Sequence, residues 1–166
     1  MSSGRQLSSF IVHDLLFGID VQEVQEAIRH LEITRVPLSP PLIAGLLNLR
    51  GQIITAIDLR VCLGLPERSA TQVPVNLILR TQDGLLSLLV DEIGAVLEPG
   101  QDSFEVAPST LRGRLKGFIR ETYKMPDRLL LILDTKRLVT ELLSMTTLPS
   151  RDIPALQHPS MSGGRK

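Results

Sequence analysis

The chain has few of the residues on which most catalytic and metal-binding sites depend. Among its 166 residues are one cysteine, three histidines, one tyrosine and no tryptophan. A single cysteine cannot form an internal disulfide or a cysteine metal cluster, which fits a reducing compartment. The histidines, His13, His30 and His158, are scattered, and no pair has the i, i+4 spacing of helical metal ligands. We therefore expect no metal and no cofactor.

An excess of charge of either sign and long apolar runs are also missing. Basic and acidic residues number 18 each, so the surface has no general attraction for nucleic-acid phosphates or anionic lipid. No apolar stretch approaches the roughly 20 residues of a membrane-spanning helix, and the first residues lack the apolar core of a signal peptide. With 43% apolar and 22% charged residues, the composition predicts an ordinary globular protein in the cytoplasm.

Recognisable catalytic motifs are absent from the sequence as well. The glycines do not have the spacing of a phosphate-binding loop, and there is no Gly-x-Ser-x-Gly nucleophile motif. Cys62 follows Val61 in an apolar context, which predicts a small core residue rather than an activated thiol. Adjacent acids such as Asp91 and Glu92 are typical of solvated turns at strand ends. We expect that the protein is not an enzyme.

What the chain does contain is a series of short apolar segments separated by turn signals, a pattern typical of all-β barrels. The clearest signal is Gln82-Asp83-Gly84, because Asp-Gly readily adopts the positive φ values of a tight hairpin. The expected strands are 6–12, 15–21, 52–58, 73–81, 85–90, 93–97, 115–123 and 129–133.

The last expected element is a helix that begins at Asp134 or Thr135, either of which can cap it. Leu138, Val139, Leu142 and Leu143 then fall on one face at helical spacing. Residues 148–166 are rich in proline, serine, glycine and charge, and we expect them to be disordered.

The most distinctive stretch is Val36–Leu65, VPLSPPLIAGLLNLRGQIITAIDLRVCLGL. Its prolines favour extended backbone before them, and Pro41 is suited to the first position of a helix. We therefore expect a short helix over residues 42–47. Gly51 then allows the turn Asn48–Gly51 to lead directly into the strand 52–58. Arg50 is a charged residue at this turn, in otherwise apolar surroundings.

This stretch resembles the signature of CheW, the coupling protein of bacterial chemotaxis, which reads roughly V-P-x-x-P-x-x-I-x-G-L-x-N-L-R-G-x-I-x-P-V-I-D-L-R-x-x-L-G-L. One departure is that the family usually has proline where this chain has Thr55 or Ala56. The resemblance implies an all-β fold of two five-stranded SH3-like barrels that share a core, with short helices and a C-terminal helix. We expect this domain to span residues 6–147, with the second lobe mainly from about residue 73 and the last segment returning to the first lobe.

The resemblance also implies a non-enzymatic adaptor that couples the cytoplasmic tip of chemoreceptors to the regulatory domain of a CheA-like histidine kinase. Such an adaptor is recruited to receptor arrays at the inner membrane without inserting into it. The positions that match the family's receptor-binding groove are Val24, Glu26, Arg50, Val75 and Val96. Those that match kinase contacts are Ile43, Gly45, Leu46 and again Arg50.

Most of these positions also have a purely structural interpretation, whereas Gly45 is interpreted through contact with a partner. Arg50 could bond turn carbonyls or Asp58 within its own lobe, where its planar guanidinium makes several directed hydrogen bonds. The three valines could be core residues, and Ile43 and Leu46 could pack inside the first lobe. Gly45 could permit the close approach of a partner's backbone.

The alternative function is nucleic-acid binding, which small barrels often perform. That function needs a basic groove and stacking aromatic residues. Aromatic residues make up only 3% of the chain, and the local basic run of Arg112, Arg114, Lys116 and Arg120 is typical of a protected strand edge. We therefore expect no nucleic-acid partner.

Overall fold

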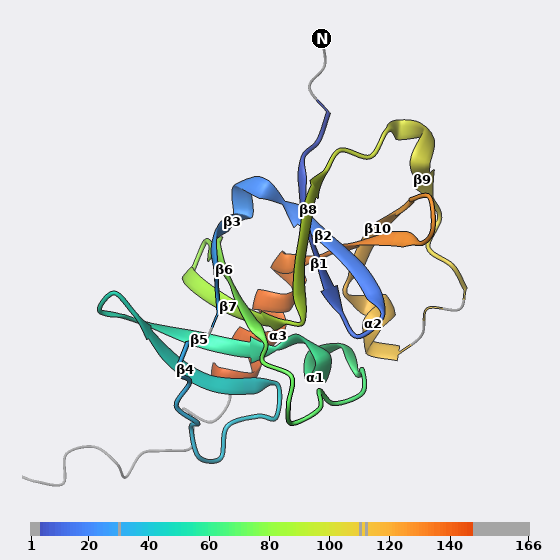
Figure 1. Ribbon diagram of the computed structural model, residues 1–166. Coiled ribbons are helices and arrows are strands. Elements are labelled where there is room, and N and C mark those ends of the chain that lie inside the picture. The colour runs from blue at the N-terminus through green and yellow to red at the C-terminus, as the bar shows by residue number, and fades with distance from the viewer. Residues whose placement is uncertain (1–3, 30, 110, 112, 148–166) are drawn as a thin grey trace, which may run out of the picture.

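The computed structural model describes residues 4–29, 31–109, 111 and 113–147, and its strands form two sheets that lie side by side (Figure 1). The first sheet has six strands in the order β8-β1-β2-β11-β10-β9, and the second has five in the order β3-β6-β7-β5-β4. The strands of the first sheet are β1 (Leu7–Val12), β2 (Leu15–Asp20), β8 (Glu92–Leu97), β9 (Phe104–Glu105), β10 (Ile119–Lys124) and β11 (Leu129–Leu133).

The second sheet is built from one continuous stretch of chain. Its strands are β3 (Val24–Arg29), β4 (Ile43–Leu49), β5 (Gln52–Asp58), β6 (Val75–Thr81) and β7 (Gly84–Val90). The hairpin β6–β7 is fully paired from Val75↔Val90 to Thr81↔Gly84, as its Asp-Gly turn predicts. β5 lies parallel to β7, so this pairing spans the whole 59–83 segment.

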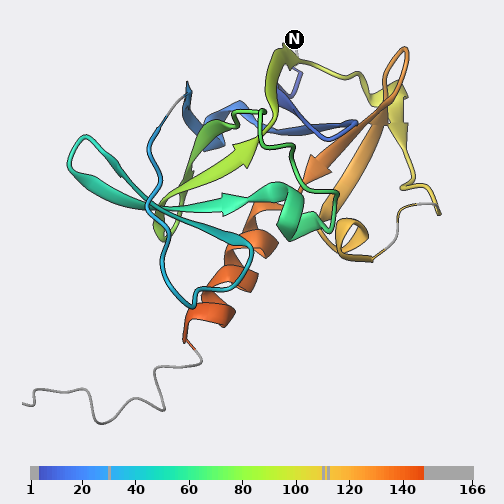
Figure 2. The same cartoon turned by 60° about the horizontal axis from the view of Figure 1, so that its bottom comes forward.

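Short helices connect and cover the sheets. They are η1 (Val21–Glu23), α1 (Leu59–Leu63), η2 (Gln101–Ser103), α2 (Gly113–Gly117) and α3 (Thr135–Thr147). α1 begins where the Asp58 carboxylate accepts a hydrogen bond from the Arg60 backbone amide, and it ends at Gly64 with φ +73°. α3 follows β11 and lies across the junction of the two sheets (Figure 2).

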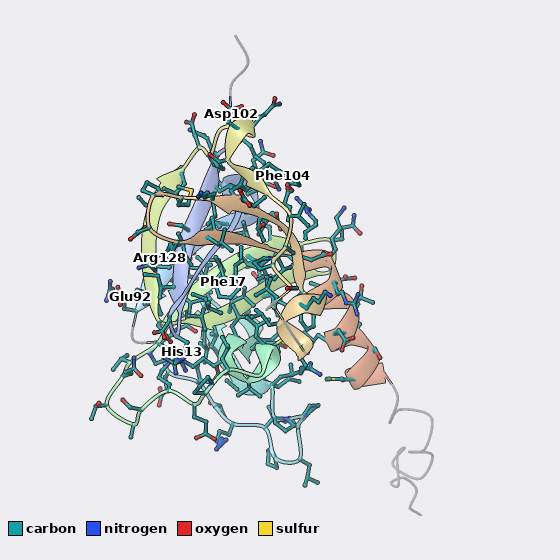
Figure 3. All side chains as sticks on the ribbon, turned by 90° about the vertical axis from the view of Figure 1, so that its right-hand side faces the viewer. His13, Phe17, Glu92, Asp102, Phe104 and Arg128 are labelled. Atoms are coloured by element: carbon teal, nitrogen blue, oxygen red, sulfur yellow. The ribbon has the colours of Figure 1, made fainter. Side chains whose placement is uncertain are left out.

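The main core is shared by both sheets and α3. Phe10 and Phe17 from the first sheet stack with ring centroids 5.7 Å apart, and they belong to the same buried cluster as Leu77 and Leu88 from the second sheet. Phe17 points into this interior in Figure 3. Leu138 completes the cluster from α3. A core of this kind joins the sheets by burying apolar surface that each would otherwise expose to water.

The expected all-β class with a C-terminal helix is confirmed, whereas three details were wrong. Of the expected helix 42–47, residues 43–47 belong to strand β4 instead, because they pair with β5 in a hairpin. The expected second lobe from about residue 73 does not match the sheets, because β6 and β7 pair with β3 and β5. The first sheet has six strands, since two-residue β9 pairs with β10. The tail 148–166 lies outside the described residues.

One further difference concerns the first strand of the last hairpin. The expected strand 115–123 begins only at Ile119, because α2 takes up the residues before it. The return of the last segment to the first sheet is as expected. β11 lies parallel to β2, with Leu130 opposite Leu16 and Ile132 opposite Gly18.

Candidate functional site

The turn between β4 and β5 holds Arg50 in an uncommon backbone conformation. Leu49 pairs with Gln52, so the loop consists only of Arg50 and Gly51, which have φ +50° and +88°. Two successive positive φ values are those of a type I′ hairpin turn, and a non-glycine residue rarely adopts them. The Asn48 side chain accepts a 2.8 Å hydrogen bond from the Gly51 amide and closes the turn. The Arg50 side chain therefore projects from a rigid hairpin.

Arg50 forms a two-pronged ion pair with Glu26 of β3. Its Nη1 and Nη2 atoms donate to the two carboxylate oxygens at 2.6 and 2.8 Å. The hydrogen bonds from Arg50 are the main reason that the pKa of Glu26 is lowered to about 2. The Arg50 side chain is 67% exposed and that of Glu26 25% exposed, so the pair is presented to solvent. Arg50 thus forms an ion pair within its own sheet. Its partner is Glu26, whereas the structural interpretation supposed turn carbonyls or Asp58.

The other end of β4 explains Gly45. Thr34 and Leu46 exchange two backbone hydrogen bonds of 2.8 Å, which join the segment after β3 to β4 and close the second sheet on itself. A Cβ atom on Gly45 would lie 2.3 Å from the Thr34 carbonyl oxygen. The close approach that Gly45 permits is therefore to its own chain, and the backbone of a partner is not needed to explain this glycine.

The predicted valines fall in three different environments. Val24 is half-buried at the start of β3 and packs against the main core. Val75 is only 2% exposed and is a core residue, so it offers no surface for a partner. Val96 is 57% exposed on β8, an edge strand of the other sheet. On β4, Ile43 and Leu46 are both half-buried. The structure brings Glu26 and Arg50 together beside Val24, but it removes Val75 from the candidate groove.

Asp91 is the residue whose role the sequence analysis missed. We expected a solvated turn residue, and this was wrong: its side chain is 6% exposed and forms ion pairs with Arg60 and Arg68. The sequence did offer one signal for a buried Asp91. Arg60 and Arg68 follow β5, and a buried carboxylate requires partners of this kind. Hydrogen bonds from Arg60, from the His13 amide and from Arg68 keep the pKa of Asp91 below its usual value, against the opposing effect of burial.

The described residues give little support for a metal site or for a reactive thiol. The described residues contain no group of three histidine, cysteine or acidic side chains that could hold a metal ion. Cys62 is 1% exposed, and burial raises the pKa of its thiol to about 11. Among the described residues, no helix is both long and apolar enough to cross a membrane.

The fold and the site together define a class: an all-β protein of two sheets with a preformed charged contact at its surface. Comparison with known proteins gives the family. The CheW-like domain family matches residues 6–143. The chain belongs to this family, and it is a coupling adaptor of the chemotaxis type.

Individual relatives cover most of the chain. It is 29% identical to the chemotaxis protein CheW of Bacillus subtilis over 151 residues, which is 91% of this chain and 97% of that protein. It is 27% identical to CheW of Treponema pallidum over 137 residues, 80% of this chain and 81% of the relative. The crystal structure of the scaffolding protein TtCheW from Thermoanaerobacter tengcongensis matches with a TM-score of 0.70 and 27% identity, covering 79% of this chain and 89% of that one.

Proposed function

We propose that this adaptor links the cytoplasmic tip of chemoreceptors to the regulatory domain of a CheA-like histidine kinase without catalysing a reaction itself. It works in the cytoplasm, at receptor arrays on the inner membrane. Its contribution is geometric: it holds receptor and kinase in an arrangement in which the ligand state of one changes the activity of the other.

The observation that carries this proposal is the exposed Glu26–Arg50 ion pair. Paired charges at a surface are worth little for stability, yet they orient a partner and select against the wrong one. Here the arginine is held in a two-residue turn and by two hydrogen bonds, so little side-chain freedom is lost when a partner binds. A partner that bonds the guanidinium or the carboxylate meets a group already in position.

The surface is divided between two partners. The receptor side comprises Val24, Glu26 and Arg50, with Val96 contributing from the other sheet. The kinase side comprises Ile43 and Leu46 on β4, next to the same arginine. Gly45 and Val75 act through the fold, because one accommodates the Thr34 backbone and the other is buried in the core.

The test is reversal of the charge at the turn. Arg50→Glu places two carboxylates together, and we expect it to abolish receptor-dependent stimulation of the kinase in a reconstituted receptor–kinase–adaptor assay while the protein stays folded. Arg128→Glu is the matched control, because Arg128 is 42% exposed at the β10–β11 turn and lies 3.9 Å from Asp127.

A double variant separates contact from architecture. Glu26→Arg combined with Arg50→Glu restores the ion pair with its polarity reversed, so it repairs any defect that comes from the fold alone. We expect it to remain inactive, because the partner meets the wrong charge. Full activity of the double variant, or of Arg50→Glu, would refute the proposed role of the pair.

A further inference from the structure

The chain passes between the two sheets at only two places within the described residues. One is η1, between β2 and β3, and the other is Asp91, between β7 and β8. Apolar packing in the shared core attracts the sheets but has no preferred direction. Hydrogen bonds to charged groups are directional and are about twice as strong as those between neutral groups. The relative orientation of the sheets should therefore depend on the polar bonds at these two places and on the 2.8 Å bond that Arg114 Nε of α2 donates to the Cys62 carbonyl of α1.

Asp91 forms hydrogen bonds with the first sheet and with the segment that follows β5 of the second sheet. From the first sheet, the His13 amide donates to its carboxylate at 2.7 Å, and the Asp91 amide donates to the Ile11 carbonyl at 2.9 Å. From the segment after β5, Arg60 donates through Nη2 at 2.5 Å and Arg68 through Nε at 3.0 Å. His13 and Glu92, the residue after Asp91, lie at the same end of the first sheet (Figure 3). One carboxylate thus joins the first sheet to the loop that carries α1.

The two arginines are fixed in turn by the end of β5 and by the segment that follows it. Arg60 also donates from Nη1 to the carbonyls of Pro66 and Glu67, at 2.9 and 3.1 Å. Arg68 contacts Asp58, the last residue of β5, at 3.4 Å. The side chains of Arg60, Asp91 and Arg68 are 7%, 6% and 9% exposed, so water does not compete for these bonds. We call Asp91, Arg60, Arg68 and His13 the Asp91 clamp.

We propose that Asp91 is a positioning residue, whose clamp sets the angle between the two sheets and so the placement of Val96 relative to the Glu26–Arg50 pair. Val96 lies five residues beyond Asp91 on β8, while Glu26 and Arg50 belong to the other sheet. A change of angle moves one part of the partner-binding surface against the other. The claim about the partner-binding surface rests on the proposed function, whereas the claim about the angle between the sheets does not.

The structural test is Asp91→Asn, measured by residual dipolar couplings of backbone amides. Asparagine has the same shape, but it keeps only one acceptor oxygen and turns an NH₂ group toward the arginine donors. In the wild type we expect one alignment tensor to fit both sheets. In the variant each sheet should require its own tensor. Asp127→Asn is the control, because it removes the same charge from a side chain that is 77% exposed.

One alignment tensor for both sheets of Asp91→Asn would overturn the inference. If that variant does not fold, Arg68→Gln takes its place, since it removes the guanidinium that bonds Asp91 and Asp58 and leaves Arg60 on Asp91. A single tensor for that variant would equally overturn the inference. In the kinase assay we expect weakened receptor-dependent stimulation with each partner still bound separately, and unchanged stimulation would refute the positioning role. Failure of the wild type to bind receptor or kinase would count against the proposed function and leave the tensor result standing.

Discussion

The closure of the second sheet at Gly45 leads to a prediction whose size follows from the structure. In Gly45→Ala the new methyl group would meet the Thr34 carbonyl oxygen at 2.3 Å, so the Thr34 segment must move. Overpacking of this kind costs about 1–3 kcal/mol. Loss of the two hydrogen bonds between Thr34 and Leu46 adds about 1–3 kcal/mol. We expect the free energy of unfolding to fall by about 2–6 kcal/mol, a large part of the roughly 5–15 kcal/mol of a typical domain.

The matched control is Gly51→Ala. Gly45 has φ +151° and Gly51 has φ +88°, so alanine strains the backbone at both positions, but a Cβ atom on Gly51 would have no other atom within 4 Å. Only the left-handed backbone then opposes alanine, at about 1–2 kcal/mol. Urea unfolding followed by far-ultraviolet circular dichroism measures both variants, and Gly45→Ala should have the midpoint shifted further, by about 1–2 M for the middles of the two ranges. Coincident midpoints would refute the closure argument.

This prediction affects how binding experiments are interpreted. Gly45 matches a kinase-contact position of the family signature, so a Gly45 variant that fails to bind a kinase could be taken as evidence for direct contact. If the unfolding data agree with the prediction, that loss of binding reflects an opened sheet. Ile43 and Leu46 are then the residues of β4 with which a direct contact is tested.

Three further predictions concern individual side chains. The pKa of Glu26 is held at about 2 instead of its ordinary 4.5, so the pair with Arg50 should stay ionised until the pH falls toward 2, while the stability that it contributes declines between about pH 4.5 and 2; carbon NMR of the Glu26 carboxyl should have its midpoint near pH 2, and Arg50→Gln should raise that midpoint. The Cys62 thiol, with its pKa raised to about 11, should react with a disulfide reagent at pH 8 only as fast as the protein opens, so rapid labelling of the folded chain would contradict its burial. Ser87→Ala removes the 3.0 Å hydrogen bond to buried Asn76 and should lower the free energy of unfolding by about 1–3 kcal/mol in urea, whereas no change would mean that Asn76 finds another donor.

Local sequence signals predicted the hairpins well but not β4. The Asp-Gly turn, the strand after Gly51 and the helix α3 are properties of neighbouring residues, and each lies where the sequence placed it. On the predicted apolar face of α3, Leu138 and Leu142 are buried, whereas Leu143 is 42% exposed. Residues 42–47 form a short apolar run, and such a run fits a helix or a strand equally. Its pairing with β5, and the contact of Gly45 with Thr34, decide in favour of a strand. Gly45 itself was the clue, since a glycine inside an apolar strand often marks a close backbone approach.

The division into two sheets could not be predicted because it depends on distant pairings. Nothing near residue 73 shows that β6 will pair with β3, or that β8 will pair with β1. The candidate site shows the same limit. The family resemblance places Glu26 and Arg50 in one expected groove, but only the folded sheet shows that these residues, 24 positions apart, form a bidentate pair. Asp91 had been interpreted from its neighbours in sequence, whereas its environment comes from Arg60, Arg68 and His13.

The parallel contact between β2 and β11 has a consequence for biosynthesis. Leu16 finds its neighbour Leu130 only after about 110 more residues have left the ribosome, which takes between about 5 and 20 seconds. The second sheet, contiguous from Val24 to Val90, is complete long before that. We therefore expect the nascent chain to assemble its middle first and to leave β1 and β2 as an unfinished edge that chaperones can bind until the final strand emerges.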